Sequence, residues 1–241
     1  MIAVGVSLDG TLARDGGAER AAFFELAGRI AAERSRPLDE VRAAAAFERM
    51  HAEVHAGRAP VERAANLALA DAVGDDLGRD YGIAYRVLAG ATAAQTTSAL
   101  PGATGLLARF SELAIPTAVL ANGWYGLERQ KARAIGFAGP VLVPPVDDWK
   151  PAQSAFDALV RLFGLTPERV WYVGTDPRTD VAGALAAGLQ AVWLNPSDER
   201  FPSDLPAPAQ TIRRLDELLD VVSGPYTRAA LSLRQLLISQ Y

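Results

Sequence analysis

A short apolar run near the start of the chain passes into a polar turn, Val4-Gly5-Val6-Ser7-Leu8-Asp9-Gly10-Thr11-Leu12. An apolar run of this length that ends at a turn is typical of a buried parallel strand. We therefore expect a strand over residues 2–7, with the polar residues directly after it.

From Leu100 onward, stretches typical of helices alternate with stretches typical of strands. The expected helices cover 103–113, 125–135, 152–163 and 180–187, and the expected strands are Thr117–Ala121, Val141–Val143, Val170–Gly174 and Gln190–Leu194. A last short strand is expected near Thr211-Ile212 and a helix over Leu215–Val222. Such alternation predicts an α/β fold, in which a parallel sheet carries helices on both faces.

Residues 16–97 contain almost no strand-like segment, and their apolar residues recur at helical spacing. Pro37 and Pro60 stand at positions suited to helix starts. This part predicts a small helical bundle inserted after the first strand. Residues 224–241 carry an apolar stripe at helical spacing, which would pack on the chain's own core or form a homodimer contact.

The composition excludes several classes of function. The chain has 241 residues, of which 50% are hydrophobic and 22% charged, and its net charge of -4 shows no basic surplus. We therefore expect neither nucleic acid nor an anionic membrane as a main partner. The absence of cysteine excludes disulfides, thiolate metal sites and cysteine nucleophiles. Without a signal-peptide pattern or an apolar run of membrane-spanning length, a cytoplasmic location is expected.

Four segments, in order and spacing, resemble the motifs of the haloacid dehalogenase (HAD) superfamily. The first motif of that superfamily reads D-x-D-G-T after an apolar run, and Ser7-Leu8-Asp9-Gly10-Thr11 stands at its place. The resemblance implies that Ser7 occupies the position of the family's nucleophilic aspartate. Asp9 then occupies the position of the general acid/base, and Gly10 and Thr11 are retained.

The other three motifs are also partly kept. Ala121-Asn122-Gly123 stands where the family has Ser or Thr before Asn, and Trp149-Lys150-Pro151 keeps the family's lysine–proline pair. The segment from Gly174 to Ala184 resembles the pattern G-D-x-x-x-x-D-x-x-G-A. Within it, Thr175 replaces the metal-binding aspartate, whereas Asp180 is retained.

The resemblance implies a fold and a reaction. The fold is a HAD-like Rossmannoid core from residues 1–14 and 99–222, a small all-helical cap from 15–98, and a C-terminal helical extension from 223–241. In HAD phosphatases one carboxylate attacks phosphorus and a second protonates the leaving oxygen. A hydroxyl residue, backbone N–H groups and a lysine hold the phosphoryl oxygens, and carboxylates bind Mg²⁺.

The replacements at the metal positions look coordinated, because both carboxylates expected to touch Mg²⁺ are lost together, at Ser7 and Thr175. Their loss removes most of the electrostatic reason for a divalent cation to bind. We therefore expect a catalytically silent HAD fold that needs no cofactor and binds a small anionic molecule, such as a phosphorylated metabolite, or a partner. The residues expected to face that ligand are Thr11, Ala121, Asn122, Lys150 and Thr175.

Two alternatives remain. The first is an active hydrolase (phosphatase) of a small phosphorylated metabolite with a non-standard site, with Mg²⁺ if activity remains. It would need an activating base for Ser7 as nucleophile, or Asp176 beside Asp180 as a metal ligand. In the second, the protein has a structural or oligomeric role, and Asp9, Lys150 and Asp180 form a buried ionic cluster.

Two histidines, His51 and His55, lie four residues apart on a predicted helix. This spacing can bind a metal, but the sequence offers no third ligand in register, so we expect a solvated helix face. Trp124 and Trp149, beside the second and third motifs, are expected to line the pocket or to pack as hinge or core residues.

Overall fold

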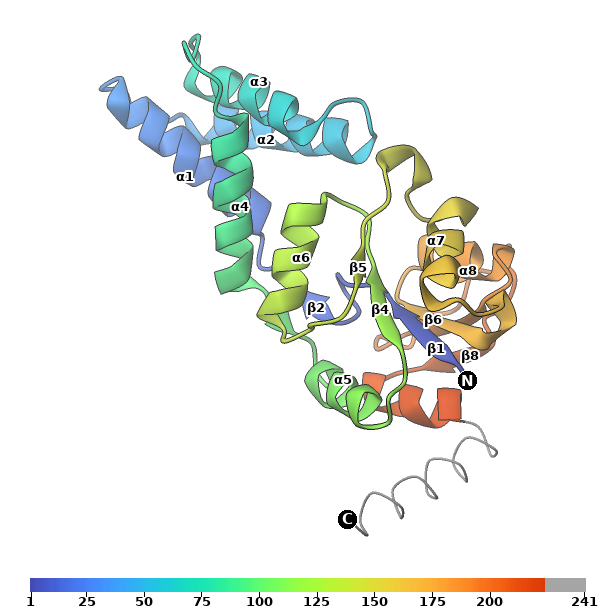
Figure 1. Ribbon diagram of the computed structural model, residues 1–241. Coiled ribbons are helices and arrows are strands. Elements are labelled where there is room, and N and C mark those ends of the chain that lie inside the picture. The colour runs from blue at the N-terminus through green and yellow to red at the C-terminus, as the bar shows by residue number, and fades with distance from the viewer. Residues whose placement is uncertain (224–241) are drawn as a thin grey trace.

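The structure, a computed structural model, describes residues 1–223 and centres on one parallel sheet (Figure 1). Its strands stand in the order β5-β4-β1-β6-β7-β8, and every neighbouring pair is parallel. Their bounds are β1 Ala3–Val6, β4 Thr117–Leu120, β5 Val141–Leu142, β6 Val170–Gly174, β7 Gln190–Leu194 and β8 Gln210–Ile212. The predicted α/β class and the strands of its sheet are therefore confirmed.

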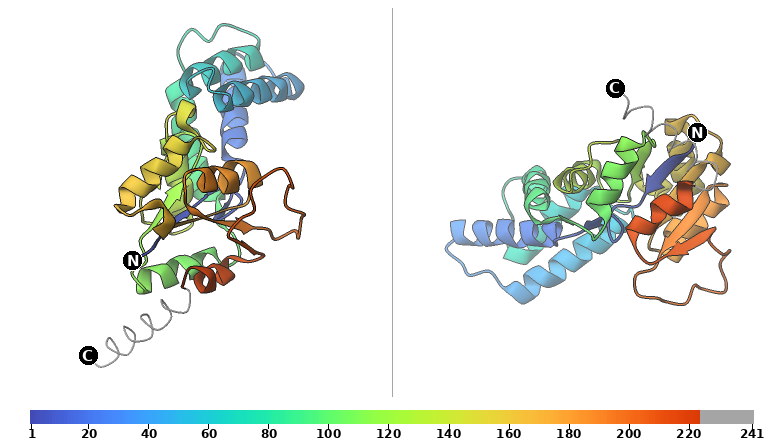
Figure 2. Two further views of the ribbon diagram at one scale, coloured as in Figure 1. Left: turned by 90° about the vertical axis from the view of Figure 1, so that its right-hand side faces the viewer. Right: turned by 90° about the horizontal axis from the view of Figure 1, so that it is seen from below.

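Helices cover both faces of this sheet, as the views in Figures 1 and 2 show. One face packs on α5 (Ala103–Glu112), α6 (Tyr125–Ala134) and the helical residues 215–222. The other packs on α7 (Gln153–Phe163) and α8 (Gly183–Ala186). Because strand side chains alternate between faces, the valines of β1 belong to the first core and its glycine faces the second.

Four helices follow β1 and form a second hydrophobic core, which we call the helical insertion. They are α1 (Ala18–Glu33), α2 (Glu40–His55), α3 (Val61–Val73) and α4 (Gly82–Thr96). At the centre of this core the Phe23 ring lies 5.6 Å from Phe47 and 6.4 Å from Tyr85 between centroids. Leu127 of α6 also joins the cluster, so the insertion rests on that helix (Figure 1).

A two-stranded antiparallel ribbon, which was not predicted from the sequence, joins the insertion to the sheet. Its strands are β2 (Ala13–Arg14) and β3 (Ser98–Ala99), with Ala13 opposite Ala99. Strands of two residues are too short for an alternating pattern to show in the sequence. The ribbon brings both ends of the insertion to one place beside β1.

The helix expected over 180–187 is instead a π-helical turn, Pro177–Ala182, that leads into α8. Asp176 begins this turn, because its Oδ1 accepts the backbone N–H groups of Arg178 at 2.8 Å and Thr179 at 2.6 Å. The Asp176 carbonyl then accepts the N–H of Val181, five residues on, at 3.2 Å. π-turns of this kind are often found at functional sites.

Three short 3₁₀ turns complete the described elements, namely η1 (Val146–Asp148), η2 (Pro167–Arg169) and η4 (Leu215–Glu217). The predicted C-terminal extension with its homodimer stripe lies, apart from residue 223, outside the described residues. Among residues 1–223, no helix combines the length and the apolar character that crossing a bilayer requires.

The close packing of β1 on α7 predicts the effect of one methyl group. A Cβ at Gly5 would lie 2.2 Å from Leu159 Cδ2, so Gly5→Ala should lower the free energy of unfolding by about 1–3 kcal/mol. Gly105→Ala, at an exposed position of α5, is the control, because its Cβ meets nothing within 4 Å and alanine favours the helix. Urea unfolding of both variants and of the native protein checks this prediction. A Gly5→Ala variant as stable as the native protein would contradict the close packing at Gly5.

Candidate active site at the carboxyl edge of the sheet

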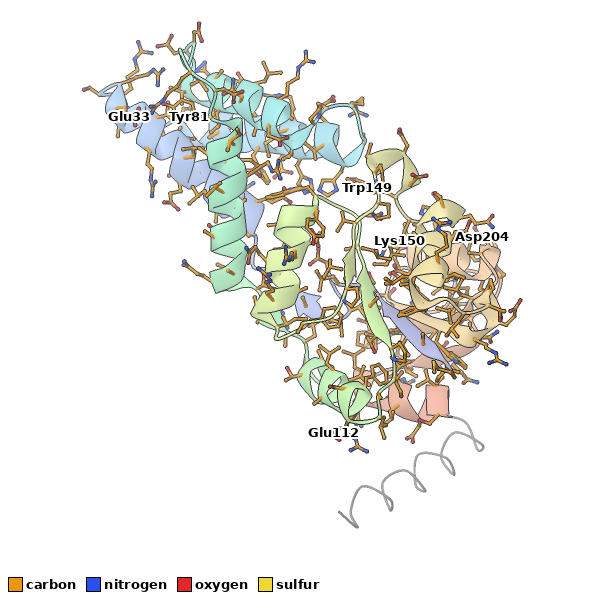
Figure 3. All side chains as sticks on the ribbon, viewed as in Figure 1. Glu33, Tyr81, Glu112, Trp149, Lys150 and Asp204 are labelled. Carbon is orange, nitrogen blue, oxygen red and sulfur yellow. The ribbon has the colours of Figure 1, made fainter. Side chains whose placement is uncertain are left out.

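The predicted site residues come together at one edge of the sheet. Ser7 follows β1, Ala121 follows β4 and Thr175 follows β6, and these three strands are neighbours. Lys150 enters from the loop before α7, and Figure 3 labels it near Trp149 and beside α7. The order of the parallel strands therefore places the four motifs side by side.

The Lys150 ammonium is the centre of this edge. Its Nζ lies 3.0 Å from Ser7 Oγ, 2.9 Å from the Tyr172 hydroxyl and 2.7 Å from Asp180 Oδ1. All four side chains are buried. Three acceptors match the three N–H donors of an ammonium group, so the cluster is saturated with hydrogen bonds.

Lys150 keeps its proton in this cluster. Burial alone would lower the pKa of Lys150, but the oxygens of Tyr172 and Asp180 outweigh burial and hold that pKa above its ordinary value. A protonated ammonium donates hydrogen bonds and takes up no proton. Lys150 therefore does not serve as the activating base that a Ser7 nucleophile needs.

Asn122 and Ala121 hold the frame of the site. The Asn122 side chain accepts the Lys150 backbone N–H at 2.8 Å and donates to the Lys150 carbonyl at 3.0 Å, just before the cis Lys150–Pro151 bond. The Ala121 N–H donates to the Leu142 carbonyl of β5 at 3.0 Å. Both groups thus bind protein partners, and their contact with a ligand stays a prediction.

Asp180 binds protein donors through both carboxylate oxygens, and Asp176 binds them through Oδ1. Asp180 accepts Lys150 on Oδ1 and the Asp176 N–H on Oδ2 at 3.1 Å. Burial would raise the pKa of Asp176, but the N–H groups of Thr179 and Arg178 outweigh burial and lower that pKa. A Cβ at Gly174 would lie 2.3 Å from Asp180 Oδ2, which explains the glycine before Thr175.

The HAD resemblance implies that Mg²⁺ binds at this edge of the sheet. Mg²⁺ is a hard cation that binds through carboxylate oxygens with octahedral geometry. Ser7 and Thr175 offer neutral hydroxyls, and the carboxylates of Asp180 and Asp176 already accept protein donors. The Lys150–Asp180 pair is also neutral as a whole. The residues present do not fit Mg²⁺.

The remaining predicted hydroxyl, that of Thr11, lies inside the protein. Thr11 is fully buried, and its Oγ1 has no hydrogen-bond partner in the described part of the chain. A ligand could reach this atom only if the turn around it rearranged. The expected ligand contact of Thr11 is therefore not available in this conformation.

Asp9 points to a second charged cluster, which the motifs did not indicate. Its Oδ2 lies 2.9 Å from Lys131 Nζ, and the same ammonium lies 3.4 Å from Glu128 Oε1 and 3.9 Å from Asp15 Oδ2. Lys131 and Glu128 of α6 are both buried. A charged pair three residues apart on the apolar face of a predicted helix was the available sequence signal.

A crevice of 120 Å³ separates this cluster from the helical insertion. Asp9, Asn122 and Lys131 line it from the side of the sheet, and Glu19, His51 and His55 line it from α1 and α2. His51 is half-buried and His55 is exposed, so the expected solvated face is confirmed for His55. The sequence did not indicate that both histidines also lie near Glu19 of α1.

Aromatic rings fix the walls of the crevice. The His55 ring lies 5.7 Å from the Trp149 ring between centroids, and the Trp124 Nε1 donates to Glu19 Oε1 at 3.2 Å. Burial, and next the neighbouring His51, lower the pKa of His55. Trp124 lines the pocket, which is one of the two roles expected for it. Trp149 contacts His55, which also lines the pocket.

The chain is similar to known proteins in sequence and in fold. The family model of haloacid dehalogenase-like hydrolases matches residues 8–188. The chain belongs to this family. A phosphoserine phosphatase of Thermus thermophilus is 35% identical over 113 residues, which are 44% of this chain and 45% of that protein. The chain spans about half the length of the curated relatives it matches.

Solved HAD structures share the fold over nearly the whole chain. A 2-haloacid dehalogenase of Pseudomonas syringae superposes with a TM-score of 0.67 at 24% identity, covering 92% of this chain and 99% of that one. A HAD hydrolase of Bacillus subtilis, solved with magnesium, gives a TM-score of 0.60 at 18% identity, covering 92% and 98%. At these identities the likeness is one of fold.

Removing the central ammonium should destabilise the HAD core strongly. Lys150→Met leaves the buried Asp180 carboxylate without its cation, and we expect a loss of about 3–5 kcal/mol in the free energy of unfolding. Lys150→Met/Asp180→Asn should recover part of the loss, since it removes the unpaired charge. Urea unfolding measures both, and a double variant less stable than the single one would contradict the ion-pair account.

The Glu128 carboxyl should make stability depend on pH. Burial raises the pKa of Glu128 to about 8, although Lys131 opposes this rise. The folded chain then holds a proton that the unfolded chain releases near the ordinary value of 4.5. Stability should therefore fall as pH rises between these two values, by roughly 2–4 kcal/mol in total.

Glu128→Gln stays neutral across this range and should flatten the dependence. The check is the free energy of unfolding at pH 5 and pH 8 for the native protein and the variant. Parallel losses in both proteins would place the titrating group elsewhere.

Proposed function

We propose that this HAD-family chain binds a small phosphorylated or otherwise anionic molecule without hydrolysing it through an aspartyl intermediate. The observation that carries the proposal is the contact between Lys150 Nζ and Ser7 Oγ at 3.0 Å. A neutral hydroxyl, held by a protonated lysine, stands where the family's chemistry requires a nucleophilic carboxylate. The hydroxyl lies in a buried cluster whose charges are already balanced.

The charge balance supports a site that works without metal. Two carboxylates at positions 7 and 175 would leave this edge with an excess negative charge that a divalent cation could neutralise. With Ser7 and Thr175 instead, Lys150 and Asp180 neutralise each other. A ligand oxygen that displaced the Ser7 hydroxyl would meet an ammonium group already in place.

The ligand class is inferred from chemistry and from the relatives. Lys150 lies at the carboxyl edge, and an ammonium group attracts phosphate or carboxylate oxygens. The matched proteins are phosphatases by name. The helical insertion is proposed as the cap that sets specificity, and the acidic chain is proposed to act in the cytoplasm without nucleic acid or membrane as partner.

An assay of phosphate release distinguishes the proposed binding protein from an active phosphatase. Phosphate release from a panel of phosphomonoesters should not exceed that of the Asp9→Asn variant, with or without Mg²⁺. The same panel should raise the Tm of the native protein through binding, because a ligand that binds only the folded state stabilises it. Mg²⁺-dependent release that Asp9→Asn abolishes would sink the proposal.

A matched variant tests whether the two replaced positions account for the missing chemistry. Ser7→Asp/Thr175→Asp restores both carboxylates of the family motifs, and we expect it to gain Mg²⁺-dependent phosphate release. Circular dichroism confirms that the variant is folded before its rate is compared with that of the native chain. The ligand part fails if no member of the panel changes the Tm of the native protein.

A further inference from the structure

Three side chains of the helical insertion converge in the crevice above Asp9. His51 and His55 lie one turn apart on α2, and Glu19 lies in the first turn of α1. Each offers one ligand atom, and these atoms all lie within 4.8 Å of one another. The imidazole rings of the two histidines lie 4.0 Å apart between centroids.

We propose that Glu19, His51 and His55 form a binding site for a divalent transition-metal ion of the zinc type. Zinc binds imidazole nitrogen and carboxylate oxygen at about 2.0–2.2 Å, and tetrahedral ligands then lie about 3.4 Å apart. Side-chain rotation would close the remaining gap of about 1 Å or less per ligand. This site is separate from the Mg²⁺ position that the family motifs imply, and it does not depend on the proposed function.

The donor set selects the class of ion. Two imidazoles and one carboxylate suit Zn²⁺ and its neighbours in the first transition row, whereas Mg²⁺ prefers an all-oxygen shell. Three protein ligands leave the fourth position of a tetrahedron open. Here the open side is the 120 Å³ crevice, which could admit water or a small oxyanion as the fourth ligand.

A supporting contact holds the carboxylate ligand in place. Trp124 Nε1 donates to Glu19 Oε1 at 3.2 Å from the start of α6, which belongs to the core around the sheet. Such outer contacts orient metal ligands and tune affinity. The Trp149 ring also lies 5.7 Å from the His55 ring between centroids.

The charge of the crevice also favours a cation. Its walls carry the carboxylates of Asp9, Asp15 and Glu19 against the single ammonium of Lys131, while Glu128 is held largely protonated at neutral pH. The crevice is therefore negative overall. The carboxylates in its walls repel one another, and a bound divalent cation would reduce that repulsion. A bound anion without a cation would increase it.

Interactions with helix dipoles can explain the positions of Glu19 and His55 but not the convergence of these residues with His51. Glu19 in the first turn of α1 and His55 in the last turn of α2 each interact favourably with a helix dipole. That interaction needs neither His51 nor the approach of α1 to the end of α2. A metal site explains the convergence of all three ligands with the Trp124 contact.

The test is a titration of the full chain with Zn²⁺ alone, without a polyhistidine tag because tag histidines bind the same ion. After treatment with a chelator, the protein should take up one equivalent in competition with a chromogenic chelator. Co²⁺ in place of Zn²⁺ should give the visible absorption of a four-coordinate ion. Mg²⁺ should neither compete nor produce the signal.

Variants separate this site from chance binding elsewhere. His51→Gln/His55→Gln should weaken Zn²⁺ binding at least 100-fold, and Trp124→Phe about 10-fold. Glu53→Gln is the matched control, because Glu53 lies between the two histidines but bonds to Arg58 instead. It should keep the native affinity.

Two results would overturn the proposal. One is a native chain that takes up no Zn²⁺ at micromolar concentration, and the other is equal uptake by the native chain and the double histidine variant. Circular dichroism of every variant keeps a folding defect from imitating loss of the site. Zinc should also raise the Tm of the native chain but not that of the double variant.

Discussion

One buried ammonium group organises the functional edge of this fold. Lys150 hydrogen-bonds to a residue after β1, a residue within β6 and a residue of the π-turn that follows β6. An unpaired charge in this interior would be costly, so Asp180 must remain beside it. That requirement fixes the π-turn, and the close approach of Asp180 in turn requires glycine at position 174.

The residues of this edge differ in charge from the family motifs that they resemble. A HAD phosphatase site holds excess carboxylates and a metal, which together activate a phosphoryl group. Here the balance is reached by removing charge at Ser7 and Thr175 instead of by adding a cation. The fold is nevertheless that of solved HAD proteins, because a fold does not by itself determine the chemistry of its site.

The sequence predicted the parts of the structure that depend on regular patterns. The strands Val170–Gly174 and Gln190–Leu194 have the predicted bounds because long apolar runs define buried strands. The π-turn and the β2–β3 ribbon escaped prediction, since both depend on a few backbone contacts and not on periodicity. Glu19 could not be joined to His51 from spacing alone, because helix packing brings them together.

The ribbon has a consequence for how such chains change over time. Leu100 N–H donates to the Leu12 carbonyl at 2.9 Å, so the chain leaves and re-enters the core at neighbouring points. A tight turn between these points would close the core without disturbing the register of β1. The side chains of the Lys150 cluster all come from outside the segment between these points, so exchange of that segment would leave the hydrogen bonds of the cluster in place.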